Sequence, residues 1–301
     1  MVERPELPPN LVILVSVSAV STASILIRLT EAPPMAIATW RLLLSTLMLF
    51  PFFVNRGGFA KLRAMGSGDL LALAGVGVVL AMHFASWITS LSYTSVASSV
   101  IFVHVDPIFV ALVSHFLLGE KLSRRVALGI GVAFVGASVI AFGDLGVGEE
   151  SLIGDALSII GAVALGVYLM AGRRLRQRLD LTTYVTPVYA VSAAVLALGS
   201  VAVGVPLVGY DARVMLLFAV IAIVPMIFGH TLYNWALKWV TAPVVSISLL
   251  GEPVGASILA FLVLGETPGS LTMIGGAVTL AGILICAYQP AGASTRGWET
   301  K

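Results

Sequence analysis

The chain has few charged residues. Only 11% of its 301 residues are Asp, Glu, Lys or Arg, and 58% are hydrophobic, whereas soluble domains carry about 25% charged residues. The mean hydropathy is +1.03. A soluble core cannot bury so much apolar surface, so the composition excludes an ordinary soluble domain. Several segments reach roughly the 20 apolar residues that cross a bilayer. The sequence therefore predicts a polytopic membrane protein.

Cysteine and the usual catalytic motifs are also scarce. Cys286 is the only cysteine, which excludes a disulfide or a cysteine metal site within one chain. The sequence has no HExxH metal motif, no G-x-S-x-G nucleophile motif and no phosphate-binding glycine loop. We therefore expect no catalytic residue, no metal, no cofactor and no nucleic-acid partner.

The apolar runs predict ten membrane spans. Barrel strands would alternate polar and apolar residues, which these runs do not, and backbone groups in lipid must bond within their own segment. The predicted fold is thus an all-α integral membrane protein. The spans lie at about 11–30, 35–54, 69–91, 94–118, 124–143, 152–171, 183–204, 212–236, 241–264 and 268–288.

The chain repeats itself with an offset of 146 residues. The shift places Trp87 on Tyr233, Pro107 on Pro253, Gly119-Glu120 on Gly265-Glu266, Gly129 on Gly275, and Gly136 on Gly282. We expect two domains, 11–143 and 152–288, with short tails at 1–10 and 289–301. Each domain holds five spans, an odd number, so the second repeat is predicted to be inverted relative to the first.

The positive charges support this inverted arrangement. Of the 17 Lys and Arg residues, only Arg28 and Arg213 fall on the side opposite the N-terminus, and Arg41 lies within span two. The remaining fourteen lie on the N-terminal side. Because positive loops stay in the cytoplasm, we predict cytoplasmic termini in a multi-pass protein of the cell membrane.

These features carry a family resemblance. Span four ends in DP…LLGE and span nine in EP…LGE, and each is followed by a fifth helix with regularly spaced glycines. Trp40-Arg41, within span two, carries the same resemblance. Over residues 10–290 the chain resembles the EamA family of the drug/metabolite transporter superfamily, although its first helix reads STASILIR without the usual Trp-Gly. The resemblance implies export of amino acids, other metabolites or drugs, with a small-molecule substrate and the bilayer as partners.

Polar side chains within the spans are the candidates for a central cavity. His83 and Trp87 share one helical face, as do His230, Tyr233 and Asn234. Polar residues inside spans usually face an interior, so we expect these five to bind substrate, with Tyr168 as a weaker candidate. Hydrogen bonding and packing between helices is the alternative.

Three further polar residues within the spans, His104, Asp106 and Arg41, have alternative interpretations. His104 and Asp106 lie about 200° apart on a helix, so only one can face a narrow cavity. His104 is taken as a substrate-binding candidate. Arg41 is expected to reach the membrane interface or pair with Glu31, with substrate binding as the alternative.

Each central carboxylate precedes a proline. Proline removes a backbone donor and clashes with the preceding turn, so Pro107 and Pro253 should kink spans four and nine and act as hinges. Asp106 and Glu252 would satisfy local backbone groups, carry a proton or contact substrate. The other expected structural residues are Glu120 and Glu266 at the span ends and the packing glycines Gly129, Gly136, Gly275 and Gly282.

Three functions are compatible with this pattern. The first is a secondary transporter in which the two repeats alternate in access, exporting an amino acid or another small polar or amphipathic compound. The second is a passive channel or scaffold, which inverted repeats with prolines in mid-span disfavour. The third is an intramembrane enzyme, for which the motifs are missing.

Overall fold

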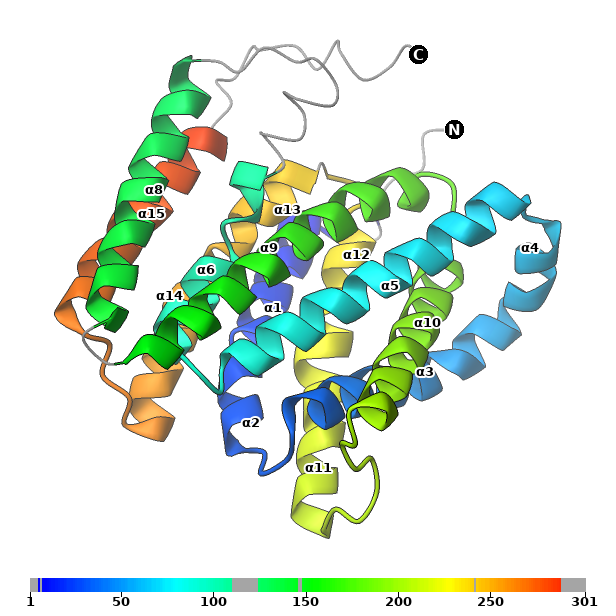
Figure 1. Cartoon of the computed structure of the whole chain (residues 1–301). Coiled ribbons are helices and arrows are strands. Elements are labelled where there is room, and N and C mark those ends of the chain that lie inside the picture. The colour runs from blue at the N-terminus through cyan, green and yellow to red at the C-terminus, as the bar shows by residue number, and fades with distance from the viewer. Residues whose placement is uncertain (1–4, 6, 110–123, 146–147, 241, 288–301) are drawn as a thin grey trace.

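The computed structural model describes residues 5, 7–109, 124–145, 148–240 and 242–287. These residues form helices joined by short turns, with no strand among them (Figure 1). The helices are α1 (Pro9–Val20), α2 (Ala23–Leu29), α3 (Pro34–Asn55), α4 (Gly58–Ala64), α5 (Ser67–Ser90), α6 (Val96–Val103), α8 (Arg124–Leu145), α9 (Glu149–Arg176), α10 (Leu181–Ala202), α11 (Ala212–Ile221), the π-helix η1 (Ala222–Thr231), α12 (Leu232–Ala236), α13 (Ala242–Leu249), α14 (Gly251–Leu259), the π-helix η2 (Ala260–Leu264) and α15 (Ser270–Ala287).

The predicted membrane fold is confirmed. Within the described part of the chain, eight helical segments are long and apolar enough to cross a membrane. Two shorter apolar helices, Val96–Phe109 and Ser270–Ile285, lie where spans four and ten were predicted. Large apolar side chains such as Phe134 and Phe142 are more than 70% exposed on α8. Such an apolar exterior suits lipid rather than water.

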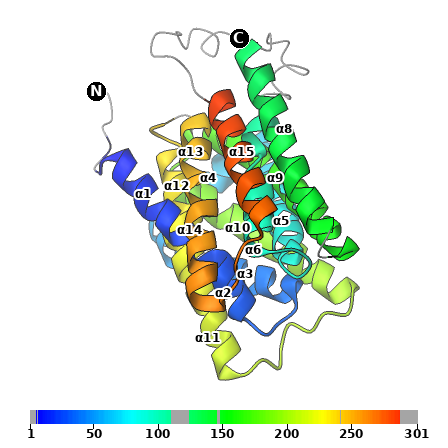
Figure 2. The same ribbon diagram turned by 90° about the vertical axis from the view of Figure 1, so that its left-hand side faces the viewer.

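The helices of the two halves contact one another in matched pairs. The second span of each half, α3 and α10, pack together, as do the fifth spans, α8 and α15. The contact of α1 with η1 is mirrored by that of α9 with α5. In both views α1 begins and α15 ends at the upper end of the molecule (Figures 1 and 2). Each half therefore contributes equivalent walls to the centre of the bundle.

Spans four and nine are interrupted where the prolines predicted kinks. α6 ends at Val103, residues 104 and 105 form a turn, and the helix resumes just before Pro107. In the second half Leu250 separates α13 from α14, in which Pro253 is the third residue. Positions 104 and 250 differ by the repeat offset of 146 residues. Both breaks come just before the proline, which lacks a backbone donor and disfavours a continuous helix there.

The predicted glycine faces lie against each other where α8 crosses α15. A Cβ atom on Gly136 would lie 2.4 Å from the Thr279 amide nitrogen. A Cβ atom on Gly282 would lie 2.3 Å from the Ala133 amide nitrogen and 2.7 Å from the Gly129 carbonyl oxygen. A Cβ atom on Gly275 would lie 2.6 Å from the Gly136 carbonyl oxygen. Only glycine allows the two backbones to come this close.

The segment 55–68, between the predicted spans two and three, contains helix α4. The aromatic rings of Phe53 and Phe59 meet edge to face at 5.2 Å. Lys61 donates a hydrogen bond from Nζ to the Asp180 carboxylate at 2.8 Å. Asp180 also caps α10, because its carboxylate accepts from the Thr183 amide at 3.1 Å. One carboxylate thus joins α4 to the start of α10.

Candidate functional site

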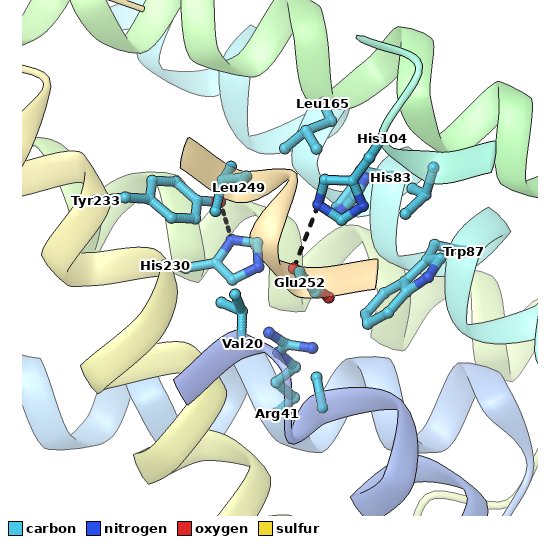
Figure 3. A pocket seen from close by; sticks show the side chains of 12 residues that line it. Val20, Arg41, His83, Trp87, His104, Leu165, His230, Tyr233, Leu249 and Glu252 are labelled. Atoms are coloured by element: carbon cyan, nitrogen blue, oxygen red, sulfur yellow. Dashed lines mark hydrogen bonds and ion pairs between the residues drawn. The ribbon is translucent and has the colours of Figure 1, made fainter. Parts of the chain in front are cut away.

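A small cavity lies at the centre of the bundle, between the two halves (Figure 3). Spans from both halves supply its walls: Val20, Ala23, Arg41, His83, Trp87, Val103, His104, Leu165, His230, Tyr233, Leu249 and Glu252. Two pairs of these residues, Trp87 with Tyr233 and Val103 with Leu249, are equivalents under the 146-residue repeat. The space that remains for the centre of a water molecule is about 20 Å³, which holds about one water. All of the lining residues are buried, so this is a small cavity in the interior of the bundle.

Arg41 lies in this cavity, not at the membrane interface. It shares the buried face of α3 with Ala38, Leu42 and Ser45, and its side chain is fully buried. The expectation that it pairs with Glu31 is wrong, since Glu31 lies 3.6 Å from Arg213 instead. The signal that could have located Arg41 is Ser45, which lies four residues further on and therefore on the same helical face.

The Arg41 guanidinium is only partly satisfied. Nη2 donates weakly to the Pro225 carbonyl at 3.4 Å, and Nε lies 3.4 Å from the Met226 sulfur. Its Cζ lies 4.2 Å from the Phe84 ring centroid, a cation–π distance. Nη1 is buried and has no hydrogen-bond partner among the described residues. A buried charged donor without an acceptor is costly, so this atom is suited to receiving a ligand's acceptor.

His104 and Glu252 form a buried pair between the halves. The Nε2 atom of His104 lies 3.3 Å from a carboxylate oxygen of Glu252, and both side chains are less than 10% exposed. On its other side, the His104 ring places Nδ1 2.8 Å from the Val100 carbonyl oxygen. His104 occupies the break after α6 and Glu252 follows the break before α14, so the helix interruptions deliver both side chains to the cavity.

Asp106 points elsewhere. Its carboxylate accepts a 2.6 Å hydrogen bond from Ser246 of α13, and Asp106 is not one of the cavity-lining residues. Its second oxygen, Oδ1, is buried without a partner in the described part of the chain. Of the two competing candidates, His104 therefore faces the cavity, as the angle between them requires.

Aromatic rings form one wall of the cavity. His83 and Trp87 stack with ring centroids 6.0 Å apart, and His230 lies 6.1 Å from His83. Tyr233 is hydrogen-bonded through its hydroxyl to His230 Nδ1. The Nε1–H donor of Trp87 is buried and has no partner among the described residues. The structure thus brings these four predicted residues together, while their role in binding stays a prediction.

Two predicted binding residues lie behind this wall. Asn234 donates from Nδ2 to the Tyr168 hydroxyl at 2.7 Å and to the His230 carbonyl at 2.6 Å. Neither Tyr168 nor Asn234 lines the cavity. Their bonds join α12 to α9 and to the backbone at the end of η1, so a contact with substrate would need a rearrangement.

Glu266 crosslinks the two halves at one end of the bundle. It accepts a 2.7 Å hydrogen bond from the Val96 amide at the start of α6 and lies 3.8 Å from Arg28. The sequence predicts a structural role for Glu266 at the end of span nine, and its contacts reach the other half. Glu120, its repeat equivalent, lies outside the described residues. No group of three His, Cys, Asp or Glu within the described residues could hold a metal ion.

Comparison with known proteins points to one class. A protein of Archaeoglobus fulgidus named "Uncharacterized transporter" is 26% identical over 86% of this chain and 89% of its own length. The "Uncharacterized transporter YyaM" of Bacillus subtilis is 24% identical over 83% of this chain and 85% of its own. The "Probable terminal-alkyne amino-acid exporter" of Streptantibioticus cattleyicolor is 27% identical over 61% of each chain.

The fold is shared with solved structures as well. One crystal structure aligns with a TM-score of 0.66 at 20% identity, covering 92% of this chain and 96% of that one. The sequence model of the EamA-like transporter family matches twice, at residues 7–142 and 152–288. Each match contains one set of five predicted spans and half of the cavity wall, so the chain belongs to the EamA-like transporter family.

Proposed function

We propose that this transporter exports a small zwitterionic or amphipathic compound of the amino-acid type, and that the central cavity is its binding site. The observation that carries the proposal is the buried Nη1 of Arg41, which lacks an acceptor among the described residues. Guanidinium groups bind carboxylates through two parallel hydrogen bonds. The unpartnered Trp87 indole N–H lies in the same wall and supplies a further donor.

The charge of the cavity favours a zwitterion over a phosphate. Glu252 is the only carboxylate among the described residues that line it, and Arg41 is the only fixed cation there. A dianionic phosphate would face one guanidinium and be repelled by Glu252. A zwitterion places its carboxylate near Arg41 and its ammonium near Glu252, and both charges are then paired.

The remaining walls suit an apolar side chain. Val20, Val103, Leu165 and Leu249 contribute aliphatic groups, and Trp87 and Tyr233 contribute rings. Apolar walls with a few convergent polar groups are typical of small-molecule sites. The relative named as an amino-acid exporter supports the same class of substrate.

Alternating access accounts for the closed cavity better than a pore does. A channel needs a continuous aqueous path, whereas this cavity holds about one water. Opening would require the halves 11–143 and 152–288 to rock against each other. The breaks before Pro107 and Pro253 lie beside the site and are the proposed flex points. The distribution of positive loops supports cytoplasmic termini, and the relative named as an exporter supports export as the direction of transport.

The test is a binding and flux panel on purified protein in liposomes. Standard L-amino acids are ranked by thermal shift, and the best one is measured in counterflow. Its amide, which lacks the carboxylate, and its deaminated acid, which lacks the ammonium, should each bind at least about tenfold more weakly, the loss expected for a charged hydrogen bond. Failure of every amino acid to bind or exchange would contradict the proposed substrate class. Flux that never saturates would favour a channel.

A further inference from the structure

We propose that His104 and Glu252 form a proton-binding pair, and that the ammonium group of the transported amino acid displaces this proton from the pair. This inference rests on the proposed function and adds what drives it. A proton moves into the cell in exchange for the zwitterion that moves out. The pair lies at the break of spans four and nine and lines the cavity from both halves.

The geometry of the His104 ring shows that the pair holds a proton beyond the one of a neutral imidazole. Nδ1 lies 2.8 Å from the Val100 carbonyl oxygen, which can only accept, so Nδ1 carries a hydrogen. Nε2 lies 3.3 Å from Glu252 Oε2. This contact is favourable only with a second hydrogen between the two atoms, on the ring or on the carboxyl group. Either way, the pair contains a proton that it can release.

The other titratable or charged groups around the pair are, element by element, Arg41 of α3, His83 of α5, Asp106 on the same span, His230 of η1 and Tyr233 of α12. His83 contacts the Gly161 carbonyl through Nδ1, and His230 contacts the Tyr233 hydroxyl. A neutral ring satisfies each of these contacts. Asp106 is paired with Ser246 outside the cavity. Among the described residues, only the His104 ring lies between two acceptors.

The substrate ammonium and this proton compete for the same carboxylate. Glu252 lies between His104 and Arg41 in Figure 3, and no other described lining residue offers a negative charge. An ammonium without a counter-charge is costly in a buried site. When the amino acid binds, its N–H groups replace the His104 N–H on Glu252. The imidazole gives its extra proton to water and remains neutral, with the hydrogen on Nδ1.

The charges on the cavity groups follow from this exchange. With the proton bound, the pair is neutral overall and Arg41 leaves a net charge of about +1. With the zwitterion bound, Arg41 and ionised Glu252 cancel. Each full cycle thus moves a proton inward and a zwitterion outward, which carries net positive charge into the cell. Transport should respond to both the pH gradient and the membrane potential.

The experiment measures protons released when the best-binding amino acid of the panel is added to wild-type protein in weakly buffered detergent solution with a pH indicator. We expect about one proton per amino acid bound, and by linkage a dissociation constant that falls about tenfold for each pH unit gained. Nitrogen-15 NMR of labelled histidines should show one ring changing from imidazolium to imidazole, or from a hydrogen-bonded to a free Nε2.

Variants of His104 and Glu252 test whether the released proton comes from this pair. His104→Gln and Glu252→Gln should bind without proton release, whereas Asp155→Asn, which removes a buried carboxylate that accepts from Thr94 and does not line the cavity, should release as much as wild type. If His104→Gln or Glu252→Gln does not bind the amino acid, the change in the histidine NMR signal of the wild-type protein decides whether His104 loses a proton. Amino-acid binding without proton release overturns this inference and leaves the proposed function standing. Release that persists in both glutamine variants also overturns it, and absence of any amino-acid binding contradicts the function itself.

Discussion

Arg41 offers the sharpest test at the scale of single residues. Arg41→Gln should lower amino-acid transport about 10- to 100-fold, because charged hydrogen bonds contribute about 1.5–3 kcal/mol. Arg41→Lys keeps the charge but loses the planar fork, so it should fall between glutamine and wild type. Flux into liposomes, normalised to monodisperse protein, is the measurement.

The matched control for Arg41 is Arg213→Gln. Arg213 is also an arginine with an acidic neighbour, but its side chain is 68% exposed and lies 3.6 Å from Glu31. Exposed ion pairs of this kind contribute about 0–1 kcal/mol, so its transport should stay close to wild type. If Arg41→Gln transported as fast as this control, Arg41 would have no part in binding.

A second residue prediction concerns stability and pH at Asp180. Partial burial opposes ionisation, but hydrogen bonds from Lys61, Thr183 and Thr182 outweigh it and hold the pKa of Asp180 well below its usual range. The ionised form is therefore favoured in the folded state. This stability is fully present above the unfolded pKa of about 3.9 and is lost as the pH falls through the lower folded value.

Asp180→Ala should accordingly destabilise the protein by about 1 kcal/mol at neutral pH, the value of a helix cap. Asp180→Asn should cost less, because asparagine also caps helices. Thermal unfolding in detergent should show the gap between wild type and the alanine variant narrowing below about pH 4. A gap that stays constant down to pH 2, or widens, would contradict the assignment.

The residues also show what a single sequence can and cannot reveal. The repeat aligned Trp87 with Tyr233, and both residues line the cavity. The role of His104 emerged only with the break in span four, which turns the ring toward Glu252. Arg41 was misplaced although Ser45, one turn further along the same face, indicated an interior position, because polar residues inside spans usually face the interior.

At the scale of helices, the crossing of α8 and α15 should be intolerant of even one methyl group. Gly282→Ala places a Cβ atom 2.3 Å from the Ala133 amide nitrogen, a backbone atom that cannot rotate away. Overpacking of this kind costs about 1–3 kcal/mol. Gly131→Ala is the control on the same pair of helices, because a Cβ there meets nothing within 4 Å.

We expect a lower melting temperature for Gly282→Ala and an unchanged or higher one for Gly131→Ala, since alanine favours helix over glycine by up to about 1 kcal/mol. Thermal unfolding in one detergent measures both variants side by side. Equal melting temperatures would show that the two helices separate at little cost, contrary to the close packing described above.

The interrupted spans make a prediction about rate. Pro107→Ala and Pro253→Ala restore a backbone donor beside each break and favour a continuous helix. If the breaks are the flex points, the double variant should exchange amino acid more slowly. A barrier raised by about 1.4 kcal/mol would slow it about tenfold. Pro51→Ala, a proline inside α3 and away from the cavity, is the control. Normal exchange in the double variant would remove the hinge proposal.

At the scale of the whole molecule, most of the architecture could be predicted because it follows from composition and repetition. Apolar length predicted where the spans lie, and the offset of 146 residues paired them. The sequence did not reveal helix α4, whose partner Asp180 lies more than a hundred residues away, or the π-helical turns η1 and η2. These features depend on contacts between distant segments, which no local pattern records.

The last prediction concerns the orientation of the whole molecule in the membrane. In a background in which Cys286 is replaced by Ser, single cysteines are placed at Val208 and Arg178. Both positions are accessible, since Val208 is 80% exposed and the Arg178 side chain is 66% exposed.

The positive charges predict that Val208, between spans seven and eight, lies outside the cell, and that Arg178, in the basic segment after span six, lies in the cytoplasm. A membrane-impermeant maleimide added to intact cells should therefore label Val208→Cys and spare Arg178→Cys, and both should react once the cells are permeabilised. Labelling of Arg178→Cys alone in intact cells would reverse the predicted orientation and contradict the cytoplasmic termini. Labelling of both in intact cells would contradict the odd number of spans per repeat, because these positions lie at opposite ends of span seven.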